Sequence, residues 1–501
     1  MSVSFKELMN LAITLGQSIR QENSKTAVFW GDDLFSYDHF GRQAGWLAAQ
    51  LKSRWGVKPG DRVGIWLKNR PEFISVLLGV LEAGCVAVPI NNFLKTEEVK
   101  HILCDAGIKV LLSDHAMREL TLALVSELPG LQEFFVEDLP PSKDLEGASI
   151  GRCERGSSDL AVIIYTSGTT GKPKGAMLSH GNLLHNVESC RQVLEAVQLD
   201  RFALILPMFH SFMLCVGILL PLCVGGSIVL IRSVHPPKHI LHEIQRHGAT
   251  ILPAIPQLFR ALSTSFEGQS LPLRLCISGA APLPSEILRE FTQTFQIPLI
   301  EGYGLSEASP VVSLNPLRGP WKTGSIGTPI PDVEVSIQDD SGKILPDGAV
   351  GEICVRGGNV MIGYWNKPEE TAKAMRDQWL LTGDIGYRDQ DGYLFITDRK
   401  KDMLLVNGIN VYPREIEEVL YQMEAVKEAA VIGRPDTRRG EQPVAFVVLN
   451  QGTQRSEREV IDFLRAKLAD YKVPRHVHFL GALPRNATGK VLKTELRSLP
   501  V

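Results

Sequence analysis

The first half of this 501-residue chain alternates two hydrophobic patterns. Short runs rich in aliphatic and aromatic residues are separated by segments in which apolar positions recur with helical spacing. Strand–helix alternation predicts an α/β fold, with a largely parallel sheet covered by helices on both faces. The strand-like runs are 26–30, 63–67, 87–90 and 109–114, and the pattern resumes at 161–164, 228–231, 250–252 and 275–277.

Two helices are predicted in this half from their end signals. One runs to Ala83, with Asn69 as its cap, Pro71 in its first turn and Gly84 just beyond its end. The other lies in the first twenty residues, where an amphipathic pattern predicts a short helix. That stretch lacks the basic start and apolar core of a signal peptide.

The pattern changes at about Trp321. Short strands separated by Gly and Asp turns follow, and they predict a small β-rich subdomain. The charged run 398-DRKKD-402 comes next, and a compact α+β pattern begins after it. We therefore expect an N-terminal domain over 1–397, with 321–397 as its β-rich part, a hinge at 398–402 and a C-terminal lid domain over 403–501.

Two helices are expected in the C-terminal domain. One starts at Pro413–Arg414. The other starts at Ser456, where Glu459 completes a capping box and apolar residues follow on one face.

One long uncharged segment could be interpreted as a transmembrane helix. From Phe202 to Ile231 there is no Asp, Glu, Lys or Arg, which by length alone is typical of a transmembrane helix. Pro207, Pro221 and His210 interrupt it, so a buried helix followed by a buried strand is the better interpretation. A long apolar segment also suits the wall of a pocket for an apolar ligand.

Composition narrows the function. The length is too great for one ordinary core, and 44% hydrophobic with 22% charged residues is typical of a soluble globular protein. A net charge of -3 gives no argument for nucleic acid or an acidic membrane. The eight cysteines form no CxxC pair, which favours buried free thiols in a reducing, cytoplasmic setting. Peripheral membrane contact stays open, as does the choice between a monomer and a homodimer.

The loop 165-YTSGTTGKPKGAML-178 follows a strand-like run and carries the strongest local chemistry. It is not a nucleotide P-loop, because Gly168 and Gly171 are only two residues apart and Lys172 precedes Pro173 instead of Ser or Thr. Glycines, hydroxyls and lysines together can still bind an anion. Taken alone, the loop leaves phosphate binding and a plain surface turn equally open.

Several further motifs occur in order along the chain, and with them it resembles the adenylate-forming superfamily. That superfamily comprises acyl- and aryl-CoA ligases, firefly luciferase and the adenylation domains of peptide synthetases. The resemblance extends from about residue 25 to about residue 495. The motifs are 165-YTSGTTGKPKG-175, 206-LPMFH-210, 278-SGAAPL-283, 302-GYGLSE-307, 381-LTGD-384, 398-DRKK-401, 407-NGINVYP-413 and 484-PRNATGK-490.

The resemblance implies an ATP site. Its loop would close over the β- and γ-phosphates, Tyr303 would stack on adenine, and Asp384 and Arg399 would hold the ribose. Each has a bland alternative when taken alone, such as a core tyrosine or a turn aspartate. The remaining residues implied at the nucleotide are Thr166, Ser167, Gly168, Thr169, Thr170, Gly171, Lys174, Gly279, Ala280 and Ala281.

The chemistry of such enzymes requires charge neutralisation, because a carboxylate must attack the α-phosphorus of ATP. The resemblance implies Mg²⁺ on Glu307, a hydroxyl from Ser306 to the α-phosphate and an ammonium from Lys490 between carboxylate and phosphate. The family more often has Thr at the Ser306 position, and the hydroxyl is retained. His210 matches an aromatic gate between acyl and nucleotide pockets, although a satisfied core histidine remains an alternative.

The second half-reaction would transfer the acyl group to coenzyme A. The resemblance implies rotation of the C-terminal domain about Lys401, after which Asn407, Gly408 and Ile409 would line the thiol tunnel. The compact spacing from Gly363 to Asp398 leaves no room for the insertion of fatty acyl-AMP ligases, which favours coenzyme A as acceptor.

The acid partner is expected to be a medium- or long-chain fatty acid, which gives the chain a role in fatty acid and lipid metabolism. The pocket candidates Met208–Gly217 and Ala254–Gln257 are apolar, and the small residues Ala280 and Gly304 would leave room for a chain. An aryl acid is the second choice. Transfer to a carrier protein is a further alternative. A non-catalytic relative would show degenerate motifs, but Lys490, Glu307 and Asp384 are all present.

Overall fold

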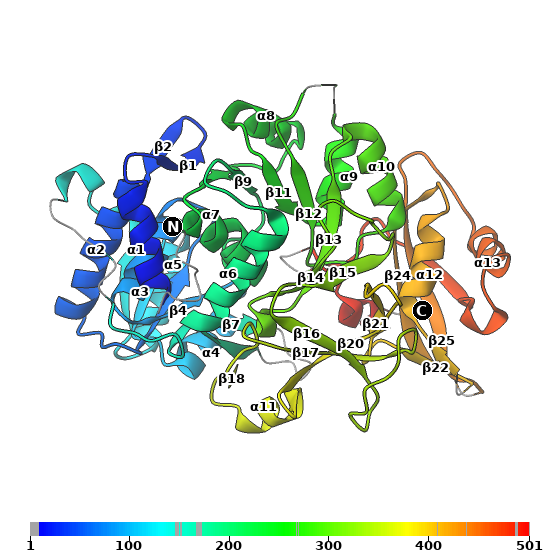
Figure 1. Ribbon diagram of the computed structural model, residues 1–501. Helices are drawn as coiled ribbons and strands as arrows, with labels where there is room; N and C mark the ends of the chain where they lie inside the picture. The colour runs from blue at the N-terminus through cyan, green and yellow to red at the C-terminus, as the bar shows by residue number, and fades with distance from the viewer. Residues whose placement is uncertain are drawn as a thin grey trace.

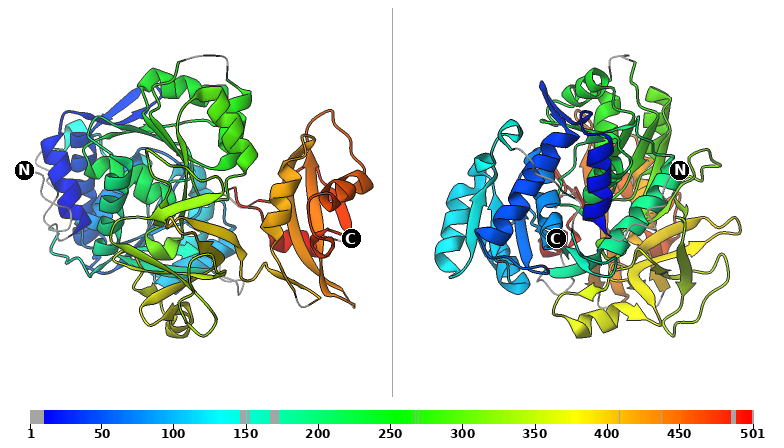
Figure 2. Two further views of the ribbon diagram at one scale, coloured as in Figure 1. Left: turned by 45° about the vertical axis from the view of Figure 1, so that its right-hand side comes forward. Right: turned by 60° about the vertical axis from the view of Figure 1, so that its left-hand side comes forward.

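The computed structural model describes residues 10–145, 150, 153–166, 173–266, 268, 270–407, 409–436, 438–485 and 489–499. Two sheets with helices between and around them form the N-terminal domain, and a third sheet forms a C-terminal domain at its side (Figures 1 and 2). This arrangement confirms the predicted α/β class.

The smaller N-terminal sheet has seven strands in the order β18-β8-β7-β4-β3-β5-β6. Its strands from β7 to β6 are parallel, with Val63 opposite both Ala87 and Val110, whereas β8 and β18 are antiparallel additions at one edge. The strands are β3 (Arg62–Trp66), β4 (Val86–Pro89), β5 (Val110–Ser113), β6 (Gln132–Phe135), β7 (Leu160–Thr166), β8 (Lys174–Ser179) and β18 (Gly363–Tyr364).

The larger sheet has fourteen strands in the order β16-β17-β20-β21-β15-β14-β13-β12-β11-β9-β10-β1-β2, with β19 beside β20. It is parallel from β1 to β13. The predicted β-rich subdomain continues it through the antiparallel pairing of β14 with β15. The strands are β1 (Thr26–Trp30), β2 (Asp33–Ser36), β9 (Arg201–Leu204), β10 (Ser227–Leu230), β11 (Ile251–Ala254), β12 (Leu275–Ser278), β13 (Leu299–Gly304), β14 (Val311–Leu314), β15 (Ser325–Pro329), β16 (Val333–Gln338), β17 (Gly351–Gly357), β19 (Met375–Arg376), β20 (Trp379–Arg388) and β21 (Leu394–Arg399).

The main hydrophobic core lies between these sheets and includes buried side chains from both, such as Val63 and Phe202. Its helices are α1 (Leu11–Gln21), α2 (Tyr37–Ser53), α3 (Glu72–Glu82), α6 (His180–Leu194), the π-helix η5 (Met213–Leu219) and α7 (Leu220–Cys223). Helices α4 (Thr96–Ala106) and α5 (Arg118–Glu127) cover the other face of the smaller sheet, and α8 (Lys238–His247), α9 (Pro256–Thr264) and α10 (Ser285–Phe295) that of the larger one (Figure 1). The short helices are η2 (His115–Met117), η3 (Val136–Asp138), η4 (Ser142–Asp144), η6 (Ser306–Ala308) and α11 (Pro368–Ala374).

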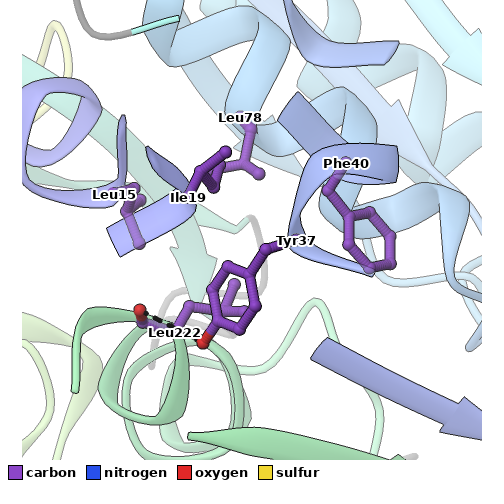
Figure 3. A pocket seen from close by; sticks show the side chains of 6 residues that line it. All are labelled: Leu15, Ile19, Tyr37, Phe40, Leu78 and Leu222. Carbon is purple, nitrogen blue, oxygen red and sulfur yellow. Dashed lines mark hydrogen bonds between the residues drawn. The ribbon is translucent and has the colours of Figure 1, made fainter. Parts of the chain in front are cut away.

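The predicted N-terminal amphipathic helix is confirmed over Leu11–Gln21, whereas residues 1–9 lie outside the described chain. It packs against α2, α3 and α7 and leaves a cavity of about 10 Å³, the space of roughly one water (Figure 3). The Tyr37 hydroxyl beside this cavity donates to the carbonyl of Gly226 at 2.8 Å. The cavity is lined by Leu15, Ile19, Tyr37, Phe40, Leu78 and Leu222, none of which was expected to bind ATP.

The prediction that Asn69 caps the helix ending near Ala83 is wrong. Helix α3 begins at Glu72, directly after Pro71, and has no side-chain cap. The Asn69 amide is used elsewhere, because it donates to the carbonyl of Leu206 at 2.9 Å and accepts from the N–H of Met208 at 2.9 Å. Asn69 therefore fixes the start of the 206–210 motif.

The apolar segment 202–231 contains the predicted buried helix followed by a buried strand, namely η5 with α7 and then β10. Strand β9 at its start was not predicted, because a short apolar run cannot be told from a buried helix by its period. Within the described chain, none of the helices combines the length and apolarity that a membrane crossing needs.

The C-terminal domain is a five-stranded sheet in the order β23-β22-β25-β24, with β26 beside β25. The predicted helix start at Pro413 and the Ser456–Glu459 capping box are confirmed. Strand β21 extends through Arg399, so the first two residues of the expected 398–402 hinge belong to a strand. Its elements are β22 (Leu404–Val406), β23 (Ile409–Val411), α12 (Pro413–Tyr421), β24 (Val426–Asp436), β25 (Gly440–Leu449), α13 (Glu457–Arg465), η7 (Asp470–Lys472), β26 (His476–Phe479) and α14 (Lys493–Ser498).

Candidate active site

Several of the expected site residues lie where parallel strands of the larger sheet end. Strands β11, β12 and β13 end at Ala254, Ser278 and Gly304, and the segments that follow carry the 254–257, 278–281 and 302–307 stretches. The carboxyl edge of a parallel sheet is the usual place for a ligand site, because successive loops converge there.

Asp384 on β20 is the centre of a polar cluster. Its carboxylate accepts from the Tyr303 hydroxyl at 2.6 Å and from Nε of Arg399 at 2.9 Å. Asp384 is only 3% exposed, so both contacts are made in a protected environment. Burial, and then the nearby Asp384 charge, raise the pKa of Tyr303 well above its usual value, which keeps the hydroxyl protonated as a donor. The structure thus joins three residues expected at the nucleoside.

The 278–281 turn is tightly built. Ala280 has a φ of 65°, which is unusual for a residue with a side chain, and strained backbone of this kind is concentrated at functional sites. A Cβ on Gly279 would lie 3.1 Å from the Phe212 ring, so the glycine allows that ring to lie against the turn. The buried hydroxyl of Ser278 finds no hydrogen-bond partner among the described residues.

The expectation that Gly304 leaves room for an acyl chain is wrong. A Cβ there would lie 2.1 Å from the carbonyl oxygen of Pro310, so the glycine is needed for close backbone packing. Its space is filled by the chain itself and not by a ligand.

The 306–311 turn holds Ser306 and Glu307. Ser306 lies 3.0 Å from the hydroxyl of Ser211, and Glu307 accepts from the Tyr364 hydroxyl at 2.8 Å. Two buried amides hold the backbone around this turn. Asn186 donates to the carbonyl of Val311 at 2.7 Å, and Asn359 donates to those of Ala308 and Val311 at 3.1 Å.

Three of these polar supports were missed by the sequence analysis, whereas Ser211 lies within the pocket candidate Met208–Gly217. The missed residues come from separate segments that only the fold brings to one turn, and they are Asn186, Asn359 and Tyr364. Asn69 could have been found, because it follows soon after a predicted parallel strand, where site residues gather.

His210 is a neutral side chain in this site. Burial lowers its pKa to about 4, and its Nδ1 accepts from the N–H of Phe212 at 3.3 Å. With Nδ1 accepting, the proton of the neutral ring belongs on Nε2. His210 can therefore offer a hydrogen-bond donor at neutral pH, and it does not add positive charge.

Lys490 is brought to the Asp384 cluster from the C-terminal domain. Its side chain is partly exposed, and the charges of the cluster act on its ammonium. Burial, and then the Arg399 charge, lower the pKa of Lys490 to about 8, while the charges of Asp384 and Asp402 act in the opposite direction. The fold thus brings the charge of Lys490 under the influence of Asp384, 106 positions earlier in the sequence.

The phosphate-loop residues Ser167, Gly168, Thr169, Thr170 and Gly171 lie outside the described chain, whereas Thr166 ends β7 and Lys174 begins β8. Lys174 forms an ion pair with Glu370 of α11. Its ammonium also lies 5.5 Å from the centre of the Tyr364 ring.

The expected coenzyme A residues lie on the β22–β23 hairpin of the C-terminal domain. Asn407 has a φ of 52°, and its N–H donates to the carbonyl of Arg439 at 2.8 Å. Ile409 is 47% exposed and Leu405 on the facing strand is 49% exposed, so the hairpin presents apolar surface. Gly408 lies outside the described residues.

The residues near Glu307 fit a magnesium ion. One carboxylate oxygen is held by Tyr364, and a partly exposed carboxylate is the kind of ligand that Mg²⁺ takes together with substrate phosphates. In the part of the chain that the structure describes, we find no group of three or more His, Cys, Asp or Glu side chains suited to a metal.

Comparisons with known proteins give the family. The profile of AMP-binding enzymes matches residues 15–365, and that of the AMP-binding enzyme C-terminal domain matches residues 415–490. The chain is 37% identical to a long-chain-fatty-acid–CoA ligase of Bacillus subtilis, over 94% of this chain and 91% of the relative. It is 36% identical to a feruloyl-CoA synthase of Amycolatopsis, over 95% and 96%.

Solved structures agree with this result. ATP-bound MatB from Rhodopseudomonas palustris has a TM-score of 0.90 at 34% identity, covering 98% of both chains. The anthranilate CoA ligase AuaEII in complex with anthranoyl-AMP has a TM-score of 0.91 at 29% identity, covering 99% of this chain and 98% of that one. The chain belongs to the AMP-binding enzymes, and within them to the adenylate-forming acyl-CoA ligases.

Proposed function

We propose that this ATP-dependent acyl-CoA ligase activates a medium- or long-chain fatty acid as acyl-adenylate and then transfers the acyl group to coenzyme A. The observation that carries the proposal is the Asp384 cluster, in which Tyr303 and Arg399 hold the carboxylate and the charges of Arg399 and Asp384 act on Lys490. A cation beside a ribose-binding carboxylate is suited to the step in which a carboxylate oxygen attacks the α-phosphorus and pyrophosphate leaves.

In the first step, Tyr303 and the 278–281 turn hold adenine, and Asp384 accepts from the ribose hydroxyls through its remaining lone pairs. Lys490 lies between the two anions and reduces their repulsion. Ser306 donates to the α-phosphate, and Glu307 would hold the metal. Magnesium bound there would neutralise charge on the phosphate oxygens.

In the second step, the thiol of coenzyme A attacks the acyl carbon, and AMP leaves. This needs Lys490 to withdraw so that the hairpin carrying Asn407 and Ile409 can approach. Rotation at the 400–402 turn around Lys401 supplies that change, as a hinge at an element end.

Support for an aliphatic acid comes from the apolar character of the segment that is predicted to line the pocket. All residues of η5 from Met213 to Leu219 are buried, and Phe212 lies against Gly279. The resemblance to a long-chain-fatty-acid ligase points the same way. An aryl acid is the second candidate, favoured by the similarity to a feruloyl-CoA synthase and an anthranilate ligase.

The test is pyrophosphate release from ATP across carboxylic acids of graded length and aromaticity, with and without coenzyme A. We expect the highest kcat/KM with medium or long aliphatic acids and an acyl-CoA product. A maximum with aryl acids would overturn the fatty acid assignment. If coenzyme A leaves the acyl-adenylate intact but an acyl carrier protein consumes it, the proposal that coenzyme A is the acceptor is overturned.

A further inference from the structure

Tyr364 lies between two groups that the proposed mechanism uses separately. It belongs to β18, which pairs with β8 at the edge of the smaller sheet, with Tyr364 opposite Ala176. Lys174 starts β8, and Glu307 lies on the 306–311 turn beside it. A single tyrosine therefore contacts the phosphate-loop strand with its ring and the catalytic turn with its hydroxyl.

The hydroxyl contact is directional. Oη of Tyr364 donates to Oε1 of Glu307 at 2.8 Å. A phenol can donate and an ionised carboxylate can only accept, so the direction of this bond is set by the two groups themselves. The bond fixes one carboxylate oxygen and thereby orients the other.

The ring contact concerns Lys174. Its ammonium lies 5.5 Å from the ring centre and is also paired with Glu370, and its side chain is only 14% exposed. A cation over an aromatic face is stabilised by the ring quadrupole. The ring thus limits where this lysine can point.

The tyrosine is itself rigidly held. Its N–H donates to Oγ1 of Thr371 at 2.8 Å, and that hydroxyl donates to the carbonyl of Lys367 at 2.9 Å. The segment just before β18 also holds the backbone of Glu307, because the N–H of Met361 donates to the carbonyl of Glu307 at 2.8 Å.

We propose that Tyr364 is a positioning residue that aligns Glu307 for the metal and Lys174 for the phosphates, so that the two act on one bound ATP. This inference rests on the proposed function, in which Glu307 holds the metal. It predicts two separate contributions from Tyr364. The hydroxyl should strengthen the part of ATP binding that depends on Mg²⁺, and the ring should strengthen ATP binding in the absence of metal.

The experiment is calorimetric titration of ATP into the full chain without any carboxylic acid, at graded Mg²⁺ and in EDTA. Tyr364→Phe should raise the Mg²⁺ concentration needed for tight ATP binding roughly tenfold, the usual value of a hydrogen bond to a charged group. Its ATP affinity in EDTA should stay near that of the wild type. Tyr364→Leu should also weaken binding in EDTA, by about threefold.

Tyr37→Phe is the matched control. It removes the hydroxyl of another buried tyrosine, which lines the cavity of Figure 3 among residues that are not expected to bind ATP, and it should leave the Mg²⁺ dependence unchanged. A double-mutant cycle with Glu307 distinguishes positioning of this carboxylate from a general loss of structure. In a Glu307→Gln background, Tyr364→Phe should have little further effect on Mg²⁺ dependence, because the tyrosine acts through that carboxylate.

Unchanged Mg²⁺ dependence in folded Tyr364→Phe, with a normal response in the wild type, overturns this inference alone. An effect that is equally large in the Glu307→Gln background also overturns it. A wild-type chain whose ATP binding ignores Mg²⁺ altogether overturns the proposed metal site as well. Melting curves of all variants identify any that fail to fold, and the cycle is then repeated with Thr371→Val, which removes the bond that fixes the Tyr364 backbone.

Discussion

The Asp384 carboxylate and the Arg399 guanidinium form an ion pair at 2.9 Å across neighbouring strands, where Asp384 on β20 is directly opposite Arg399 on β21. The second oxygen of Asp384 accepts from Tyr303 at 2.6 Å. Each oxygen therefore already has one protein donor before ATP arrives. Two paired strands hold the carboxylate, so its orientation is fixed by the protein itself.

Replacing Asp384 with Asn tests this arrangement. The amide keeps the shape but loses the charge and turns one acceptor into a donor, which cannot accept from a ribose hydroxyl. Hydrogen bonds to charged groups contribute about 1.5–3 kcal/mol, so the KM for ATP should rise roughly tenfold to a hundredfold. Pyrophosphate exchange with varied ATP measures it. Tyr303→Phe removes only one donor to Asp384 and should have the smaller effect, and the reverse order would contradict the ribose role.

A substitution at Ala280 tests whether this residue lines the acyl pocket. Gly304 does not line that pocket, because backbone fills the space beside it. Ala280→Trp should shift the preference to shorter acids, because each methylene that no longer fits loses about 0.8 kcal/mol, which is about fourfold in kcat/KM. The measurement is kcat/KM over a series of saturated acids, with the KM for ATP as control. A raised KM for ATP with an unchanged chain-length preference would show that residue 280 lies on the nucleotide side of the site.

The sequence analysis succeeded where the signal was local or repeated. Parallel strands such as 26–30 could be predicted from composition, and the Ser456–Glu459 capping box from its spacing. The sequence analysis failed where a side chain could bind either its neighbours in the sequence or a distant segment. Asn69 has the chemistry of a helix cap, but its amide binds the 206–208 backbone, which is distant in sequence.

The same limit explains why the motif residues of the site could be found from the sequence, whereas the residues that hold them in place could not. Glu307 and Asp384 could be proposed as site residues because they lie within motifs. Asn186, Asn359 and Tyr364 act across the fold, and no local pattern distinguishes them from ordinary buried residues. Gly304 was misjudged because a small side chain indicates free space only when no backbone occupies it.

Lys401 tests the hinge. It lies in the 400–402 turn after β21, and its N–H makes no backbone hydrogen bond with the described residues, so Pro would remove none of those. Pro fixes φ and resists rotation. Lys401→Pro should spare acyl-adenylate formation and slow thioester formation at least tenfold, whereas Lys401→Ala should affect both steps little.

The two half-reactions are measured separately, by pyrophosphate release and by acyl-CoA formation from presynthesised acyl-adenylate. Proline also restricts the residue before it, and Lys400 pairs with Asp340 and Glu352. Lys400→Ala therefore controls for loss of those pairs. Equal loss of both half-reactions in Lys401→Pro, with Lys400→Ala active, would contradict a hinge at this position.

Lys490 makes the sharpest prediction, because its proposed role belongs to one half-reaction and burial lowers its pKa to about 8. Removing one preorganised donor typically costs about 3–4 kcal/mol, so Lys490→Ala should slow adenylation roughly a hundredfold to a thousandfold. Thioester formation from presynthesised acyl-adenylate should survive. Melting curves of Lys490→Ala and the wild type, measured alongside, separate the loss of this charge from a loss of fold.

The pH profile gives an independent test of the same residue. The protonated ammonium is the active form, and its pKa in the free enzyme is lowered to about 8, so kcat/KM for adenylation should fall as the pH rises through about 8. Lys490→Arg keeps its charge to far higher pH and should lose this alkaline decline, even at a lower absolute rate. If the decline persists in Lys490→Arg, another group titrates there. If Lys490→Ala adenylates at nearly the wild-type rate, the lysine is a surface residue, and the charge that brings carboxylate and phosphate together must come from Arg399 or the metal.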